Sequence, residues 1–279
     1  MSIELPEAKI LAKQMDKELR GKRVKSSHLK DCEKLQKIGF VNKDIKAFDQ
    51  LVDGKIESIT SRGNVIRVKL DNKTNLLLSP EYGGRVTYHA SEKTVPDQLH
   101  LRVDFSDNTV LAVRLTGMGV IHALKDNELE RSYVYRRDFL SEVPSPIDEQ
   151  DFTLERFLKL LANRKQVMKS LLVGKEAVVV GLGNSAYQDI IYKARIHPRR
   201  KASELNKEEK CALYNAVKHV VRQRIKLGGK DKFVDLYGKQ GGYTPAMGSH
   251  IGVCPTCGAS IERLSLGGGQ TYFCSKCQR

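Results

Sequence analysis

Four cysteines near the end of the 279-residue chain have the types and spacing of a metal site. They form two pairs, Cys254/Cys257 and Cys274/Cys277, with two residues inside each pair and sixteen residues between the pairs. Two such pairs about 15–20 residues apart are typical of a tetrahedral thiolate site for zinc. Four sulfurs leave no position for a reacting water, so the pattern predicts one structural Zn²⁺ that folds a zinc ribbon. A pair of disulfides and four free thiols are the alternatives.

A second group suited to chemistry is the turn at residues 181–184, Gly-Leu-Gly-Asn, directly before a predicted helix. Two glycines let the backbone approach another surface closely, and a helix N-terminus attracts a phosphate. Gly183 and Asn184 are therefore predicted to contact a nucleic-acid strand. Glycines that only turn the chain between two helices are the alternative.

Charge is distributed unevenly along the chain. Residues 1–150 contain 25 Lys and Arg against 23 Asp and Glu, whereas residues 151–279 contain 23 against 10. The net charges of +2 and +13 make up the +15 of the whole chain. A strongly basic half that ends in a zinc ribbon favours nucleic acid as partner. A basic surface that only keeps the protein in solution is the alternative.

The sequence gives little sign of a membrane or an export route. No apolar run approaches the ~18–20 residues that span a membrane, and no signal-peptide pattern opens the chain. The two remaining cysteines, Cys32 and Cys211, are far apart in the sequence. Four thiols that are reserved for a metal, together with two thiols that form no disulfide, indicate a reducing compartment. We therefore expect a cytoplasmic monomer with no membrane partner.

The elements that must position these groups change along the chain. Residues 6–20 are predicted as a helix, because Pro6 suits a first turn and Leu11, Met15 and Leu19 recur on one face. From residue 55 the apolar period becomes two, which predicts an antiparallel β-sandwich. The predicted strands are Ile56–Thr60, Val65–Leu70, Thr74–Leu78, Val86–His89, Leu99–Phe105, Val110–Leu115 and Val120–Leu124.

The second half has helical periodicity. Helices are predicted at about residues 153–161, 165–172, 184–194 and 206–227, the last ended by Gly228 and Gly229. Between the halves, the sequence Pro144-Ser145-Pro146 with acidic neighbours predicts a linker. The predicted order of elements is specific: two helices, a Gly-rich turn, further helices and then a ribbon.

These parts resemble the formamidopyrimidine-DNA glycosylase and endonuclease VIII (Fpg/Nei) family. Residues 175–184, 196–198 (Ile-His-Pro) and 201–203 resemble its helix–two-turn–helix module. Residues 234–239 and the ribbon resemble the segment that follows, and residues 4–7 (Glu-Leu-Pro-Glu) are similar to the family's start. The resemblance covers nearly the whole chain in the correct order.

The resemblance implies an α+β fold. Residues 1–143 would form an N-terminal helix and an antiparallel β-sandwich, residues 144–151 a linker, residues 152–240 a helical helix–two-turn–helix DNA-binding domain, and residues 241–279 a C-terminal zinc ribbon. Duplex DNA, damaged or abasic, would lie in the cleft between the two halves.

The resemblance also implies DNA N-glycosylase and AP lyase chemistry, in which an N-terminal proline amine attacks the sugar C1′ and a neighbouring glutamate moves protons. Here Ile3 occupies the proline's position and Glu4 keeps the glutamate's. Removal of Met1 would place the terminal amine on Ser2, a displacement of up to ~3.5 Å. A misplacement of ~1 Å can cost about a hundredfold in rate. Ser2 and Glu4 are therefore the predicted catalytic residues of a weak or altered activity; a helix-terminal charge is the alternative for Glu4.

Several positions that contact DNA in the family are changed. The resemblance places its hairpin lysine at Asn64, its wedge residue at Tyr82, its orphan-base loop at residues 116–119 with Met118, and its ribbon arginine at Gly269. The alternatives are a simple turn for Asn64 and packing against the sheet or core for Tyr82 and Met118. Lys239, shortly before the ribbon, is predicted to contact phosphate.

We therefore expect a base-excision-repair protein that binds damaged or abasic duplex DNA and has weak or altered activity. Loss of two basic side chains would weaken binding mainly in a salt-dependent way, whereas loss of the proline affects the reaction itself. Two alternatives stay open: a non-enzymatic sensor of DNA lesions, and a protein that binds structured RNA.

Overall fold

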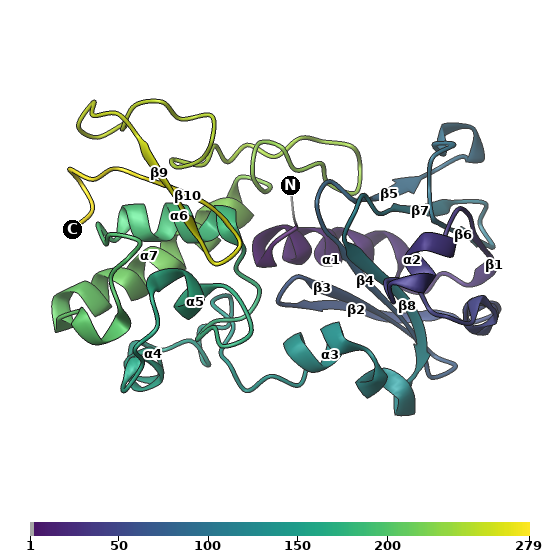
Figure 1. The fold of residues 1–279 in the computed structure, drawn as a ribbon. Helices are drawn as coiled ribbons and strands as arrows, with labels where there is room; N and C mark the ends of the chain where they lie inside the picture. The colour runs from purple at the N-terminus through teal and green to yellow at the C-terminus, as the bar shows by residue number, and fades with distance from the viewer. Residues whose placement is uncertain (1–2) are drawn as a thin grey trace. The chain divides into compact units, whose positions relative to one another are not determined.

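The computed structural model describes residues 3–279 (Figure 1). The chain forms two compact units. The N-terminal unit contains the chain up to Leu140 and a returning segment, Gly228–Gly242; the C-terminal unit contains Ser141–Leu227 and Tyr243–Arg279. The returning segment departs from the expected boundaries, which assigned residues up to 240 to the helical domain.

The N-terminal unit begins with helix α1, Leu5–Leu19. Pro6 lies in its first turn, where the missing N–H costs nothing, and the Glu7 carboxylate accepts a hydrogen bond of 3.1 Å from the Glu4 backbone N–H. The predicted helix at 6–20 is confirmed to within one residue at each end. Its buried face, which includes Leu11, Met15 and Leu19, packs against strand β2, Ile56–Arg62.

Two antiparallel four-stranded sheets confirm the predicted β-sandwich (Figure 1). One has the order β1-β6-β7-β5 and the other β2-β3-β4-β8. The remaining strand bounds are β1 Val24–Leu29, β3 Val65–Leu70, β4 Thr74–Pro80, β5 Arg85–His89, β6 Leu101–Phe105, β7 Val110–Arg114 and β8 Gly119–Lys125.

Strand β1 and several short helices were not predicted. In β1 only Val24 is fully buried, so the strand has almost no apolar alternation. The short helices fall below the length at which periodicity can be recognised. They are α2 Glu33–Lys37, α3 Tyr133–Asp138 and the 3₁₀ segments Ile45–Leu51, Glu92–Thr94 and Asp126–Arg131.

The returning segment belongs to the N-terminal unit because its apolar side chains complete that unit's core. Phe233 and Leu236 are 5% and 0% exposed and lie in one cluster with residues of α1 and both sheets. Polar contacts add to this anchoring: Gln14 donates to Asp235 at 2.8 Å, and the Leu236 carbonyl accepts from the Tyr88 N–H at 2.9 Å. The segment is thus bound on several sides to the sandwich.

The C-terminal unit contains the predicted helices; the second begins three residues later than expected, and the others agree to within one residue at each end. Their bounds are α4 Leu154–Leu161, α5 Met168–Leu172, α6 Asn184–Lys193 and α7 Lys207–Lys226, with a 3₁₀ turn at Ala202–Glu204. Thr153 and Asn206 cap α4 and α7, since each side chain accepts a hydrogen bond from the first turn. Gly228, with φ +75°, follows α7 and suits its termination.

The stretch predicted as a linker is instead packed. Pro144, Ser145 and Pro146 are buried, and the Pro144 carbonyl accepts a hydrogen bond of 3.3 Å from the Val180 N–H. Proline-rich sequence therefore acts here as a rigid part of the C-terminal unit. The chain ends in a two-stranded ribbon, β9 Glu262–Leu266 and β10 Gly269–Phe273. Over residues 3–279, no helix is both long and apolar enough to span a bilayer.

Candidate nucleic-acid interface and metal centre

The four cysteines of the ribbon converge on one point. Cys254 and Cys257 precede β9, and Cys274 and Cys277 follow β10. Their Sγ atoms all lie within 4.8 Å of one another, and all four are free thiols. The separations of 3.8 Å for Cys254–Cys277 and 3.5 Å for Cys257–Cys274 suit sulfurs at ~2.3 Å from a central Zn²⁺. The donor set is that of one structural zinc, as predicted.

Groups around Cys254 favour the metal-binding form of this thiol. The Tyr192 hydroxyl lies 3.3 Å from Cys254 Sγ and 2.6 Å from Thr256 Oγ1. Burial works to raise the pKa of Cys254, but the Tyr192 hydroxyl and nearby backbone N–H groups stabilise the thiolate and lower that pKa to about 6. A thiolate is the form that ligates zinc. Tyr192 thus joins the metal centre to α6.

The second cysteine pair is also fixed to the helical part of the unit. Gln278, 1% exposed, accepts from the Cys274 N–H at 2.9 Å and donates to the Ile196 carbonyl at 3.0 Å. The backbone of the final residue pairs with residues 195 and 197. Ribbon and helices therefore form one body within the C-terminal unit.

The Gly-rich turn lies directly against this ribbon. Gly183 precedes the first residue of α6, Asn184, whose Nδ2 donates to the Gln270 carbonyl of β10 at 3.1 Å. Gln188, one turn further, accepts from the Tyr272 N–H at 2.7 Å. The Asn184 amide thus positions the turn against the hairpin. The predicted phosphate contacts of Gly183 and Asn184 stay predictions.

A lysine that the sequence did not single out lies beside the ribbon turn. Lys169 of α5 is 7% exposed, and its Nζ donates to the Leu266 carbonyl at 2.6 Å. The same Nζ lies 3.1 Å from where a Cβ at Gly269 would be, the position at which the resemblance expects an arginine. Burial lowers the pKa of Lys169. Nothing in an amphipathic helix distinguishes such a lysine from a solvent-exposed one.

A buried ion pair holds the chain just after residue 242, a stretch that was expected to belong to the zinc ribbon but had no predicted role. Arg224 of α7 and Asp189 of α6, with side chains 0% and 2% exposed, pair at 3.0 Å. Asp189 also accepts from the Tyr243 hydroxyl at 3.0 Å and from the Met247 N–H at 3.1 Å. This carboxylate therefore joins two helices to the chain that leads into the ribbon.

In the N-terminal unit, Asn64 is more than a turn residue. Its N–H donates to Asp138 at 3.1 Å, its Nδ2 donates to Glu81 at 3.0 Å, and its Oδ1 accepts from Arg137. The preceding Gly63 has φ +58°, and a Cβ there would lie 2.3 Å from the Asp138 carboxylate, so only glycine fits. The Arg137 guanidinium, from the unpredicted α3, thus lies where the resemblance expects a lysine.

Tyr82 and Met118 lie on two loops that are hydrogen-bonded to each other. The Tyr82 carbonyl accepts from Thr116 Oγ1 at 2.6 Å, and the Met118 carbonyl accepts from the Glu81 N–H at 3.2 Å. The side chains are 54% and 47% exposed, so neither packs into the core. Tyr82 has φ +49°, an uncommon conformation for a bulky residue that is often associated with function. Since Glu81 binds Asn64, the structure brings these three predicted residues together.

The predicted reaction centre lies at the start of α1. Ile3 is 5% exposed and forms part of the core. Glu4 is 3% exposed, and its carboxylate lies 3.8 Å from Nζ of Lys230 in the returning segment. Ser2 lies outside the described residues. The prediction of catalysis by Ser2 and Glu4 therefore stays a prediction, and Lys230 is a neighbour that the sequence did not indicate.

Lys239 lies in a tight turn of the returning segment. The Asp235 carboxylate accepts from the N–H groups of Tyr237 at 3.0 Å and Lys239 at 2.8 Å, which fixes the turn. The Lys239 side chain is exposed, as a phosphate contact requires.

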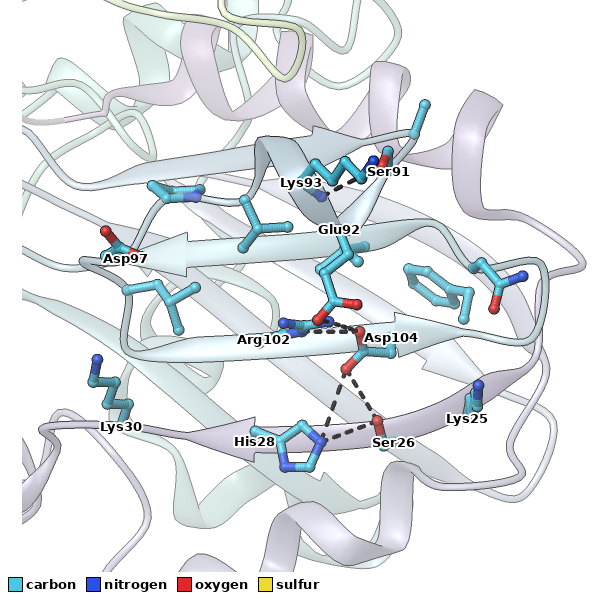
Figure 2. A pocket seen from close by; sticks show the side chains of 17 residues that line it. Lys25, Ser26, His28, Lys30, Ser91, Glu92, Lys93, Asp97, Arg102 and Asp104 are labelled. Carbon is cyan, nitrogen blue, oxygen red and sulfur yellow. Dashed lines mark hydrogen bonds and ion pairs between the residues drawn. The ribbon is translucent and has the colours of Figure 1, made fainter.

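A pocket of about 1180 Å³ lies elsewhere in the N-terminal unit, over strands β1 and β6 (Figure 2). Arg102 at its centre pairs with Asp104 and Glu92, each at 2.7 Å. These carboxylates neutralise much of the local charge, and no residue of the predicted site lines the pocket. It does not form part of the candidate interface.

Three family models match the chain in order. The formamidopyrimidine-DNA glycosylase N-terminal domain matches residues 3–116, the helix–two-turn–helix domain of the same glycosylase matches residues 143–234, and the zinc finger found in that glycosylase and isoleucyl-tRNA synthetase matches residues 252–279. Between these matches, only residues 117–142 and 235–251 are left out. 

Individual relatives carry the same name. A formamidopyrimidine-DNA glycosylase of Streptococcus pneumoniae is 26% identical over 283 residues, covering 99% of this chain and 98% of that protein. One from Bacillus cereus is 28% identical over 245 residues, covering 84% and 85%. Among solved structures, the Thermus thermophilus MutM (Fpg) protein has a TM-score of 0.82 at 21% identity, covering 99% of this chain and 98% of that one. The Lactococcus lactis Fpg in complex with DNA containing an abasic site has a TM-score of 0.84 at 20% identity, covering 99% of both chains.

Proposed function

Because the chain belongs to the formamidopyrimidine-DNA glycosylase (Fpg/Nei) family, we propose that it is a DNA-repair protein that binds duplex DNA containing a damaged base or an abasic site. The observation that carries this proposal is the junction of turn and ribbon in the C-terminal unit. Asn184 and Gln188 of α6 both bind the backbone of β10, so that the Gly-rich turn and the ribbon present one continuous surface.

The C-terminal unit supplies most of the binding energy in this proposal. Residues 151–279 have a net charge of +13, and a helix N-terminus next to a glycine favours a phosphate. Contacts of this kind position the duplex without reading its sequence. Binding to phosphates releases the counterions of the DNA, and this release is less favourable when the salt concentration is high. The affinity should therefore fall steeply as the salt concentration rises.

The N-terminal unit supplies lesion preference. Tyr82 and Met118 are exposed and held by adjoining loops, which suits apolar groups that enter a base stack. Unstacking costs least at a damaged or missing base. Exposed apolar groups of this kind would favour such sites over intact duplex.

Catalysis is expected to be weak or altered. Ile3 is buried in the core at the position of the family's proline, and its backbone nitrogen is an amide without a usable lone pair. Turnover then depends on another amine, and Glu4 is the group available for proton transfer. The buried Ile3 also favours a second function, a non-enzymatic lesion sensor that binds the same DNA without releasing a base.

Fluorescence anisotropy tests the binding proposal. The protein is titrated into labelled duplexes with and without one tetrahydrofuran abasic-site analogue, at several salt concentrations and with structured RNA as competitor. We expect preference for the abasic duplex and a strong salt dependence. Equal affinity for intact duplex, or displacement by RNA rather than DNA, would contradict the proposal. A second assay measures base release and strand cleavage on duplexes with natural lesions. Either product would show an enzyme, whereas selective binding without product would show a lesion sensor.

The compartment is part of the same proposal. Cys32 and Cys211 are free, as are the four zinc-site thiols. Free thiols beside a metal site suit a reducing compartment, and we place the protein in the cytoplasm, where it would meet DNA.

A further inference from the structure

The glutamate retained from the family's reaction centre has an amine beside it. Lys230 Nζ lies 3.8 Å from Glu4 Oε1, and the two side chains are 2% and 3% exposed. Removing two charges from water carries a large desolvation penalty for each ion. A lysine is therefore an expensive residue to place here, and a purely structural position would be filled more cheaply by an apolar side chain.

The backbone holds this amine in place. The Lys230 N–H donates to Glu7 Oε1 at 3.2 Å, while the other Glu7 oxygen accepts from the Glu4 N–H at 3.1 Å. Lys230 and Glu4 are thus fixed by the same carboxylate, at one end of α1. Gly229 before Lys230 has φ +94°, and Phe233 after it lies in the core, so both sides of the lysine are constrained.

We propose that Lys230 is the nucleophile of this protein, an internal amine that takes the place of the missing N-terminal proline and forms a Schiff base with the sugar of an abasic site. The inference rests on the proposed function, since it requires that the protein binds abasic DNA. In this proposal a lysine side chain performs the nucleophilic attack, which Ile3 cannot perform because its backbone nitrogen is not a free amine.

The reaction balances with the groups at hand. Glu4 takes a proton from the Lys230 ammonium, and the neutral amine attacks the aldehyde carbon C1′ of the ring-opened sugar. Glu4 returns this proton to the C1′ oxygen to give a carbinolamine, and then carries a second proton from the carbinolamine nitrogen to the same oxygen. The C1′–O bond breaks, water leaves, and a protonated imine remains. Glu4 then removes a C2′ proton, the C3′–O bond breaks, and the 3′ phosphate departs. Water hydrolyses the imine and restores the amine.

Burial has a role in this scheme. Both groups are almost fully shielded, so the sugar must displace the chain that covers them when it enters. Exclusion of water protects the imine from early hydrolysis.

The experiment is borohydride trapping of the full-length, zinc-loaded protein on a duplex with a natural abasic site. Borohydride reduces an imine to a stable secondary amine, and digestion followed by mass spectrometry locates it. We expect the adduct on Lys230. An adduct on the N-terminal amine or on another lysine overturns the inference, and this result needs no variant.

A matched pair of variants gives an independent readout. K230R keeps the positive charge beside Glu4 but is not nucleophilic, whereas K232R makes the same change at an exposed position two residues away. We expect K230R to give no more covalent adduct than a protein-free control. Its affinity for the tetrahydrofuran duplex should equal that of the unaltered protein. K232R should match the unaltered protein in both adduct yield and affinity. Trapping by K230R overturns the inference. If K230R fails to fold, the adduct map decides.

The two proposals fail in different ways. A protein that does not bind abasic duplex contradicts both the proposed function and this inference. A protein that binds it selectively and forms no adduct keeps the proposed function as a lesion sensor and excludes Lys230 as nucleophile.

Discussion

The N-terminal unit and the chain after Tyr243 in the C-terminal unit are stabilised by different means. The N-terminal unit has one extensive apolar core built from α1, both sheets and the returning segment. In the C-terminal unit, the chain after Tyr243 buries few hydrophobic residues; they are Met247, Cys254, Phe273 and Cys274. It is held instead by the metal centre, by Gln278 and by the carboxylate of Asp189.

This difference determines what a substitution can reveal. In the N-terminal unit, Tyr82 and Met118 project from loops and can be changed without affecting the core. In the C-terminal part, the groups that hold the fold also shape the predicted DNA surface. Binding and stability should therefore change together in the C-terminal unit and separately in the N-terminal unit.

Removal of zinc should have the largest effect. Structural zinc contributes about 10–16 kcal/mol of apparent binding free energy in small zinc domains. We expect C257S, or treatment with a strong chelator, to unfold the ribbon and to abolish measurable preference for abasic DNA, while the N-terminal unit stays folded. Limited proteolysis with mass spectrometry would show cleavage confined to the chain after Tyr243.

The matched control is C211S, which changes a free thiol of α7 outside the metal site. It should keep the zinc content and the proteolysis pattern of the unaltered protein. Retention of full DNA affinity by zinc-free protein would show that the ribbon is not part of the interface.

Breaking the buried ion pair should have the next largest effect. R224M leaves the Asp189 carboxylate buried without its cation, and loss of one member of such a pair costs about 3–5 kcal/mol. We expect a lower free energy of unfolding in urea and weaker DNA binding. K226M, an exposed change on the same helix, should stay within about 0.5 kcal/mol of the unaltered protein.

The double variant D189L/R224M sharpens this test. It removes both charges, so part of the loss should be recovered, because two apolar groups replace an unpaired charge. Recovery should be incomplete, since Tyr243 and Met247 also lose their hydrogen-bond acceptor. A double variant no more stable than R224M would show that the ion pair is not what R224M breaks.

The same contrast explains how much could be predicted from sequence. The metal centre and the long helices were predictable because short-range spacing fixes them: two Cys pairs are close in sequence, and α7 has twenty residues of helical period. Strand β1 was not predictable, because its side chains are mostly polar. Its place in the sheet comes from pairing with β6, which is more than seventy positions away in the sequence.

The candidate site shows the same limit. Glu4, Asn64, Tyr82 and Met118 could be named by resemblance, and the structure shows which of them adjoin. Their neighbours could not be predicted, because each comes from a distant part of the chain and no local pattern marks it. These neighbours are Arg137 beside Asn64 and Lys230 beside Glu4. The proline-rich stretch at 144–146 was misleading for the opposite reason: its composition is typical of linkers, but tertiary packing buries it.

Changes at the exposed loops should separate binding from stability. Stacking of an aromatic side chain on a base contributes about 1–3 kcal/mol. We expect Y82A to weaken binding to abasic duplex by that amount and M118A to weaken it less, with the free energy of unfolding unchanged. I38A, an equally exposed apolar change elsewhere in the unit, should affect neither. Loss of stability in Y82A would mean that the loop conformation, not base contact, is what the tyrosine provides.

The smallest expected effect comes from restoring the charge that the family has at Asn64. N64K adds one cation at a hairpin where Arg137 already lies. One further phosphate contact makes the slope of log affinity against log salt concentration more negative by about 0.9. Part of the gain at low salt should be lost, because a lysine cannot accept the hydrogen bond that Arg137 donates to Asn64 Oδ1. N64A removes the same hydrogen bond without adding charge and is therefore the reference. If N64K and N64A have equal salt slopes, the hairpin does not reach phosphate, and lesion preference must come from Tyr82 and Met118 alone.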